Sequence, residues 1–113
     1  MANVSDSFTV QAPLETVWQA CEGAVVAIGW TVASKSSNIH LVCKEPMGTY
    51  LLYAMPVAIE INLTRVSPQA TQINLKGSNF GLGPIAANHI KGHMNTIRGR
   101  IASLAAAPQG VGS

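Results

Sequence analysis

Two histidines four residues apart, His89 and His93, come closest to a chemical motif in this 113-residue chain. On a helix, a spacing of four places both imidazoles on one side, where both could reach one metal ion. The residues between them include a lysine and no glutamate, so the general base of zinc-protease helices is absent. The sequence does not place a third ligand, and the candidates are His40, Glu60, Cys21 and Cys43.

The helical phase of the two histidines favours a structural role for both. His93 borders the apolar stripe of the C-terminal helical segment, whereas His89 lies further round the helix, towards solvent. A histidine at the edge of a core and a histidine at the surface need no ligand. We therefore predict no bound metal and no cofactor.

A glycine-rich segment precedes the histidines. Residues 81–86 match the G-x-G-x-x-[GA] pattern of dinucleotide-binding turns. Such a site also needs a following parallel strand and an acidic residue about 20 positions later, but no acidic residue follows Glu60. Pro84 also removes a backbone N–H near the start of the helix. The glycines and the proline instead indicate a turn that leads into a helix.

The composition excludes several classes of partner. Charged residues make up 11% of the chain, and the seven basic residues are scattered, so the basic stripe that nucleic acid requires is absent. The longest uncharged apolar segment, residues 47–59, contains Pro56 and is shorter than the roughly 20 residues of a membrane-spanning helix. The first eight residues do not resemble a secretory signal. We expect a cytoplasmic protein that neither spans a membrane nor binds nucleic acid.

The hydrophobic periodicity predicts an α+β fold. Residues 13–29 and 84–104 each carry one apolar stripe at helical spacing. A short strand precedes the first helix, and between the helices the period changes to two, which predicts four or five strands joined by short hairpins. The segments with this alternation are residues 8–10, 30–34, 39–43, 57–63 and 73–75, with residues 47–54 ambiguous.

The order of the predicted elements favours an antiparallel sheet. Strands and helices do not alternate along the chain, so a parallel sheet is disfavoured. We expect one face of the sheet to be solvated and the other to be covered by both helices. The prediction is a single domain over residues 1–104, followed by a flexible tail over residues 105–113.

The same order of elements resembles the START-like helix-grip superfamily, of the polyketide cyclase and lipid-transfer type. The resemblance is carried by SFTVQAPLETVWQAC (residues 7–21), QINLKGSNFG (residues 72–81), the GLGP break (residues 81–84) and the closing amphipathic helix. It implies a curved sheet that wraps the long C-terminal helix and encloses an apolar cavity. The chain departs from the superfamily in having fewer strands, and a single helix replaces the usual helix pair.

The resemblance implies a non-catalytic domain that binds an apolar small molecule or lipid-like ligand between the sheet and the C-terminal helix. Adaptable and aromatic side chains supply the pocket candidates. These candidates are Trp18, Trp30, Met47, Tyr50, Tyr53, Met55, His93 and Met94. An enzyme of the cyclase or hydrolase kind is a weaker alternative, because no nucleophile is paired with a base; Glu45, for example, falls in a predicted loop.

An assembly module without a ligand is the other alternative. Small and amide side chains cluster on the side of the C-terminal helix opposite its apolar stripe, and a helix face of this kind allows another backbone to approach closely. The low charge of the chain also favours self-association into a homo-oligomer. The interface candidates are Asn88, Gly92, Asn95 and Gly99.

Overall fold

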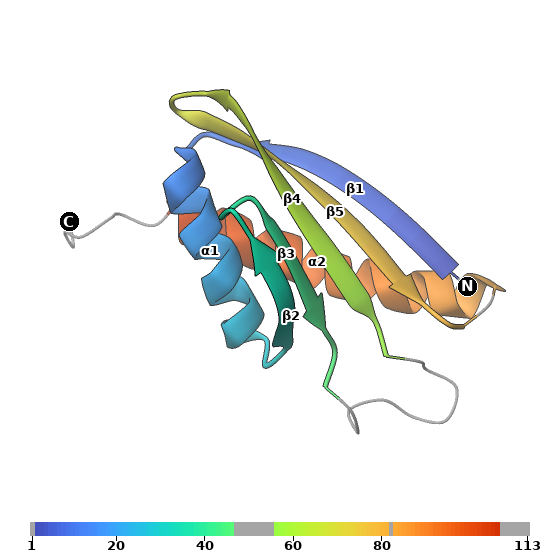
Figure 1. Cartoon of the computed structure of the whole chain (residues 1–113). Coiled ribbons are helices and arrows are strands. Elements are labelled where there is room, and N and C mark those ends of the chain that lie inside the picture. Colours follow the sequence, from blue (N-terminus) through green and yellow to red (C-terminus); the bar gives the residue numbers. More distant parts are fainter. Residues whose placement is uncertain (1, 47–55, 82, 107–113) are drawn as a thin grey trace.

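The computed structural model describes residues 2–46, 56–81 and 83–106. Its elements are β1 (Ala2–Val10), α1 (Leu14–Ala27), β2 (Thr31–Ser36), β3 (His40–Lys44), β4 (Ala58–Ser67), β5 (Ala70–Asn79) and α2 (Gly83–Ala106). The five strands form one antiparallel sheet in the order β1-β5-β4-β3-β2. The long helix α2 packs along β1 and β5, and α1 packs against α2 and β4 (Figure 1).

This arrangement confirms the predicted fold class. The chain is an α+β protein with a curved open sheet, and the long C-terminal helix packs on one of its faces (Figure 1). The ambiguous segment 47–54 lies outside the described residues. None of the described helices is long and apolar enough to cross a membrane.

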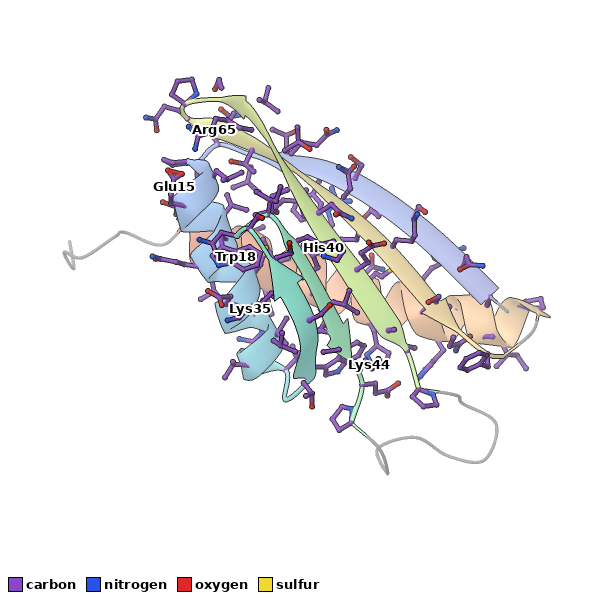
Figure 2. The ribbon with its side chains drawn as sticks, viewed as in Figure 1. Glu15, Trp18, Lys35, His40, Lys44 and Arg65 are labelled. Atoms are coloured by element: carbon purple, nitrogen blue, oxygen red, sulfur yellow. The ribbon has the colours of Figure 1, made fainter. Side chains whose placement is uncertain are left out.

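Helix α1 forms where the sequence predicts it. Its apolar side is buried, and its first turn carries Glu15, which suits the positive end of the helix. Glu15 also forms an ion pair with Arg65 of β4, with 3.0 Å between Nη2 and Oε2, so the start of the helix lies beside that strand (Figure 2). Gly29 ends the helix with a φ of 79°, a conformation that favours glycine.

The hairpin between β2 and β3 turns at Ser37 and Asn38, whose φ angles of 54° and 58° both lie in the left-handed region. Two such residues in succession are typical of a tight type I′ turn. A bulge interrupts β2 between Val32 and Ser34, so that Ser34 pairs with Val42. The continuous alternation predicted over residues 30–34 is therefore wrong, because the extra residue of a bulge reverses the alternation that follows.

Strand β1 is longer than its sequence predicts. The alternation extends to Ala2, and Asp6 interrupts it on the inner face, where an apolar residue is expected. Asp6 accepts a hydrogen bond from Arg98 of α2, with 2.8 Å between Oδ2 and Nη1. The same guanidinium lies over the Phe8 ring, 4.6 Å from its centroid. The prediction of a short strand over residues 8–10 is therefore wrong. Asp6 can lie on the inner face because Arg98 pairs with it, so the strand extends beyond this charged residue to Ala2.

The core lies between the inner face of the sheet and the two helices. The fully buried side chains include Leu41, Ile59, Ile61, Ile73, Leu75, Ile90, Met94, Ile97 and Ile101. Ile90 and Met94 lie directly over Gly77 of β5, where an added Cβ would collide with Ile90 and lie 2.9 Å from the sulfur of Met94. Helix and sheet are therefore in close contact at this point.

The C-terminal end of α2 extends two residues beyond the predicted helix. The helix ends at Ala106, and Ala105 is buried. Leu104, predicted to belong to the apolar stripe, is 38% exposed. It lies against Gly23 of α1, where an added Cβ would be 3.3 Å from Leu104 Cδ1. Close packing of the two helices therefore accounts for the position of Leu104 at the edge of the core.

Candidate functional site

Three polar side chains converge on the inner side of the sheet where β3 ends. Glu45 directly follows β3, and His89 and His93 lie in the N-terminal half of α2. His89 Nε2 is 3.4 Å from Glu45 Oε1, and His93 Nε2 is 3.3 Å from Glu45 Oε2. We refer to Glu45, His89 and His93 as the Glu–His cluster.

Glu45 points inward because it continues the alternation of β3. Leu41 and Cys43 face the core at 0% exposure, and Glu45 is the next residue in the same phase. Its backbone N–H donates to the Val57 carbonyl at 2.9 Å, and its Oε1 accepts the Val57 N–H at 3.1 Å. The side chain is only 4% exposed. A buried carboxylate is unfavourable unless it is paired and hydrogen-bonded, so these contacts fix its position.

The end of α1 brings Trp30 to the same place. The Gly29 N–H donates to the Val26 carbonyl at 3.0 Å, and the Trp30 N–H donates to the Val25 carbonyl at 3.1 Å. This pair of bonds is a Schellman motif, which directs the residue after the glycine back onto the helix. The Trp30 ring is buried and meets the His93 ring edge-on, with centroids 5.0 Å apart and an angle of 63° between the planes.

The histidine rings are half-buried and lie against each other. Their centroids are 4.7 Å apart and their planes are nearly perpendicular, at 84°. Burial lowers the pKa of His93 below its ordinary value of 6.5; the Glu45 carboxylate acts in the opposite direction, and His89 lowers it further. The neutral imidazole of His93 is therefore favoured at neutral pH, and its nitrogen lone pair is available to a donor or a cation.

The two cysteines do not add a nucleophile to the site. Cys21 and Cys43 are fully buried free thiols, and the Cys43 Sγ lies 3.6 Å from the Ile59 carbonyl oxygen. Burial is the main cause that raises the pKa of each thiol to about 12. The thiolate is the reactive form of cysteine, and it is therefore suppressed at both positions.

A second histidine–carboxylate pair lies on the opposite, solvated face of the sheet. His40 Nε2 is 2.7 Å from Glu60 Oε2, between β3 and β4 (Figure 2). The hydrogen bond from His40 lowers the pKa of Glu60 below its ordinary value. Glu60 therefore points to the solvated face, opposite its buried neighbours Ile59 and Ile61. This position also separates His40 and Glu60, both considered as third ligands, from His89 and His93.

The structure brings together some of the predicted pocket residues. Trp30 and His93 touch, and Met94 lies next to His93 in sequence but packs over Gly77. Trp18 is buried on α1 (Figure 2). The other four candidates, Met47, Tyr50, Tyr53 and Met55, lie outside the described residues.

The predicted interface residues all lie on the exposed side of α2. Asn88, Gly92, Asn95 and Gly99 are exposed, and an added Cβ at either glycine would meet no atom within 4 Å. Their exposure leaves this helix face free within the described part of the chain.

Glu45 is the residue of the site that sequence reasoning missed. The sequence predicts Glu45 in a loop, and the residue does follow β3, but its side chain keeps the inward phase of Leu41 and Cys43. His89, which the helical phase places towards solvent, is half-buried against Glu45. A signal for both was present in the sequence: a charged residue that continues an inward-facing alternation needs a partner from another element.

Comparisons with known proteins identify the fold. Neither the protein-family models nor the curated protein sequences contain a match to this chain. Among solved structures, a Nitrosospira multiformis protein superposes with a TM-score of 0.68 at 14% identity, over 90% of this chain and 94% of that one.

Two further neighbours carry more informative names. A START superfamily protein from Mycobacterium smegmatis has a TM-score of 0.67 at 9% identity, over 89% of this chain and 94% of that one. The Aha1 dimer from Colwellia psychrerythraea has a TM-score of 0.65 at 16% identity, over 94% and 98%. The chain therefore has the START-like fold that its sequence resemblance predicts.

Proposed function

We propose that this protein is a non-catalytic domain that binds an apolar, lipid-like small molecule between the sheet and α2. The ligand would lie at the Trp30 end of the inner face, with its polar group at the Glu–His cluster. The observation that carries the proposal is the convergence of Glu45, His89 and His93 beside Trp30, on a sheet face that is mostly apolar.

Small-molecule sites combine mostly apolar walls with a few polar groups that fix the orientation of the ligand. The inner face has this composition at the end of β3, where Glu45 offers carboxylate oxygens and His93 offers a ring nitrogen. Close packing of α2 on Gly77 argues against a ligand buried along the middle of the helix. The Trp30 end of the inner face is the better location, because aromatic and polar groups meet there.

A binding role suits this site better than catalysis. A covalent mechanism needs an activated nucleophile, and burial keeps both thiols protonated. The neighbour from Mycobacterium smegmatis is named a START superfamily protein, which is consistent with a ligand-binding domain. We also propose the cytoplasm as its location, because both cysteines are free thiols and reducing compartments preserve them.

The test uses the two tryptophans as position markers. Native mass spectrometry of untagged protein first shows whether a co-purified molecule leaves on denaturation. Single-tryptophan variants, Trp18→Phe and Trp30→Phe, are then titrated with dibromostearate, whose bromine atoms quench tryptophan fluorescence on contact. We expect strong quenching in Trp18→Phe, which retains Trp30, and weak quenching in Trp30→Phe, with unbrominated stearate as the control.

Two outcomes contradict this proposal. A protein that carries no extra mass and shows no quenching of either tryptophan does not bind lipid-like molecules as proposed. Equal quenching of Trp18 and Trp30 would place the ligand elsewhere than the Trp30 end of the inner face.

A homo-oligomeric assembly module is the second candidate function. It is favoured by the open glycines on α2 and by one structural neighbour that was solved as a dimer. Light scattering during gel filtration should show an oligomer that Gly92→Leu and Gly99→Leu dissociate, whereas Thr64→Leu on the outer sheet face leaves it intact. A monomer at every concentration, or an oligomer that both glycine variants retain, would contradict this role.

A further inference from the structure

We propose that the Glu–His cluster is a binding site for one divalent transition-metal ion of the zinc type. The ligands would be the carboxylate of Glu45 and the Nε2 atoms of His89 and His93. The inference goes beyond the proposed ligand-binding function, because it concerns an ion held by the protein's own side chains. It also replaces the expectation that the two histidines are only structural.

The spacing of the three side chains suits metal coordination. Their candidate ligand atoms all lie within 4.8 Å of one another. A tetrahedral zinc site with bonds of about 2.0–2.1 Å has ligand atoms about 3.3 Å apart. His89 Nε2 lies 3.4 Å from Glu45 Oε1 and His93 Nε2 lies 3.3 Å from Glu45 Oε2, so each nitrogen is at about that separation from one of the two carboxylate oxygens. A rotation of the two imidazoles towards each other would bring their two nitrogens to the same separation.

The same distances are long for hydrogen bonds to a carboxylate. Charge-assisted N–H···O bonds are typically about 2.7–2.9 Å long. The His40–Glu60 pair on the outer face, at 2.7 Å, has this length. Neither histidine of the cluster approaches Glu45 so closely, although the carboxylate is buried and each ring nitrogen faces it. A cation between the three groups would contact the carboxylate and both nitrogens at once.

Contacts within the protein hold the cluster in place without the ion. The i, i+4 spacing on α2 aligns the two imidazoles on one side of the helix. The Val57 N–H donates to the Glu45 carboxylate, and the Trp30 ring packs against the His93 ring. Contacts of this kind, outside the coordinating atoms, orient ligands and strengthen metal binding.

Two histidines and one carboxylate leave at least one coordination position open. Sites of this composition hold Zn²⁺ in hydrolases and Fe²⁺ in oxygenases, with water or substrate in the open position. Both imidazoles are about 30% exposed, so an ion can reach the cluster from solvent. The open position would face the same space as Trp30, where a polar group of a bound molecule could complete the coordination.

The test is metal binding by untagged protein. After chelation and dialysis, the protein is titrated with zinc by calorimetry and with cobalt by visible absorption, and bound metal is counted by mass spectrometry. We expect one ion per chain and the intense visible bands of a four- or five-coordinate cobalt site. His89→Ala, His93→Ala and Glu45→Gln should each weaken the zinc affinity at least about 100-fold, more than loss of an orienting contact does.

The matched control is His40→Ala, which removes a histidine from the other histidine–carboxylate pair and should leave the affinity unchanged. Circular dichroism verifies that each variant is folded. If Glu45→Gln does not fold, His89→Gln serves in its place, because His89 is half-buried and at a helix surface. Less than one ion per chain, unchanged affinity in both histidine variants, or an equal loss in His40→Ala would each overturn the proposal.

Discussion

Replacing Gly77 by alanine should destabilise the protein, because α2 leaves no space for a side chain at that position. An added Cβ would collide with Ile90 and lie 2.9 Å from the sulfur of Met94. Met94 is flexible and can move aside. The colliding Ile90 atom is Cγ2, on the branched Cβ of a buried helical residue, and its rotamer is restricted.

The expected magnitude follows from two opposing effects. Overpacking a well-packed core costs about 1–3 kcal/mol. Alanine also restricts the unfolded chain, which returns about 0.4–1 kcal/mol. The net loss in the free energy of unfolding is about 1–2 kcal/mol, which lowers the melting temperature of a domain of this size by about 5–10 °C.

The matched control is Gly92→Ala on the exposed side of α2, where an added Cβ meets no atom within 4 Å. Alanine is favoured over glycine inside a helix by about 1 kcal/mol, so this variant should be more stable than the parent protein. Urea and thermal unfolding, followed by circular dichroism, measure both variants. The same substitution should therefore have opposite signs at the two glycines.

A double variant isolates the contact itself. Ile90→Leu keeps the side-chain volume but removes the Cγ2 branch that the new methyl would strike. Combined with Gly77→Ala, it should cost at least about 0.5 kcal/mol less than the sum of the two single changes. A Gly77→Ala protein that is as stable as the parent, or single changes that simply add, would refute the close packing of α2 on β5.

Two further predictions concern pH and thiol chemistry. The hydrogen bond from His40 lowers the pKa of Glu60 below its ordinary value of 4.5. Above that pH, this exposed pair should therefore add a few tenths of a kcal/mol to the free energy of unfolding. The contribution should disappear as the pH falls through the lowered pKa, and urea unfolding of Glu60→Gln should lack this part of the pH dependence; an unaltered profile would contradict it. Burial raises the pKa of Cys21 and Cys43 to about 12, so both thiols should resist iodoacetamide at neutral pH until urea unfolds the chain. Mass spectrometry of the alkylated protein measures this, and rapid labelling of the folded protein would disprove their burial.

The parts of the fold that depend on local pattern could be predicted from the sequence. The apolar stripe of α1 and the position of Gly29 fix that helix, because periodicity and the left-handed C-terminal residue are local properties. The alternation of β4 likewise predicts that Glu60 is on the solvated face. Such predictions need no knowledge of which distant residues meet.

Charged residues on the inner face could not be predicted in the same way. Asp6 and Glu45 both break an inward-facing apolar pattern, and the partners that make this tolerable come from α2, far away in the sequence. Only the folded chain shows that Arg98 lies beside Asp6 and that both histidines lie beside Glu45. The bulge in β2 could not be predicted for a related reason, because an alternation pattern does not show where a strand carries one unpaired residue.

The strand order has a consequence for how the chain acquires its structure during synthesis. Neighbours from β2 to β5 are consecutive in sequence, so three of the four strand pairings can form as each strand emerges. The pairing of β1 with β5 is different: the Gln72 amide donates to the Ser7 hydroxyl across 65 residues. Strand β1 is synthesised before its partner and therefore keeps an unpaired edge until β5 leaves the ribosome. Closure of this long loop is a slow step that follows formation of the hairpins.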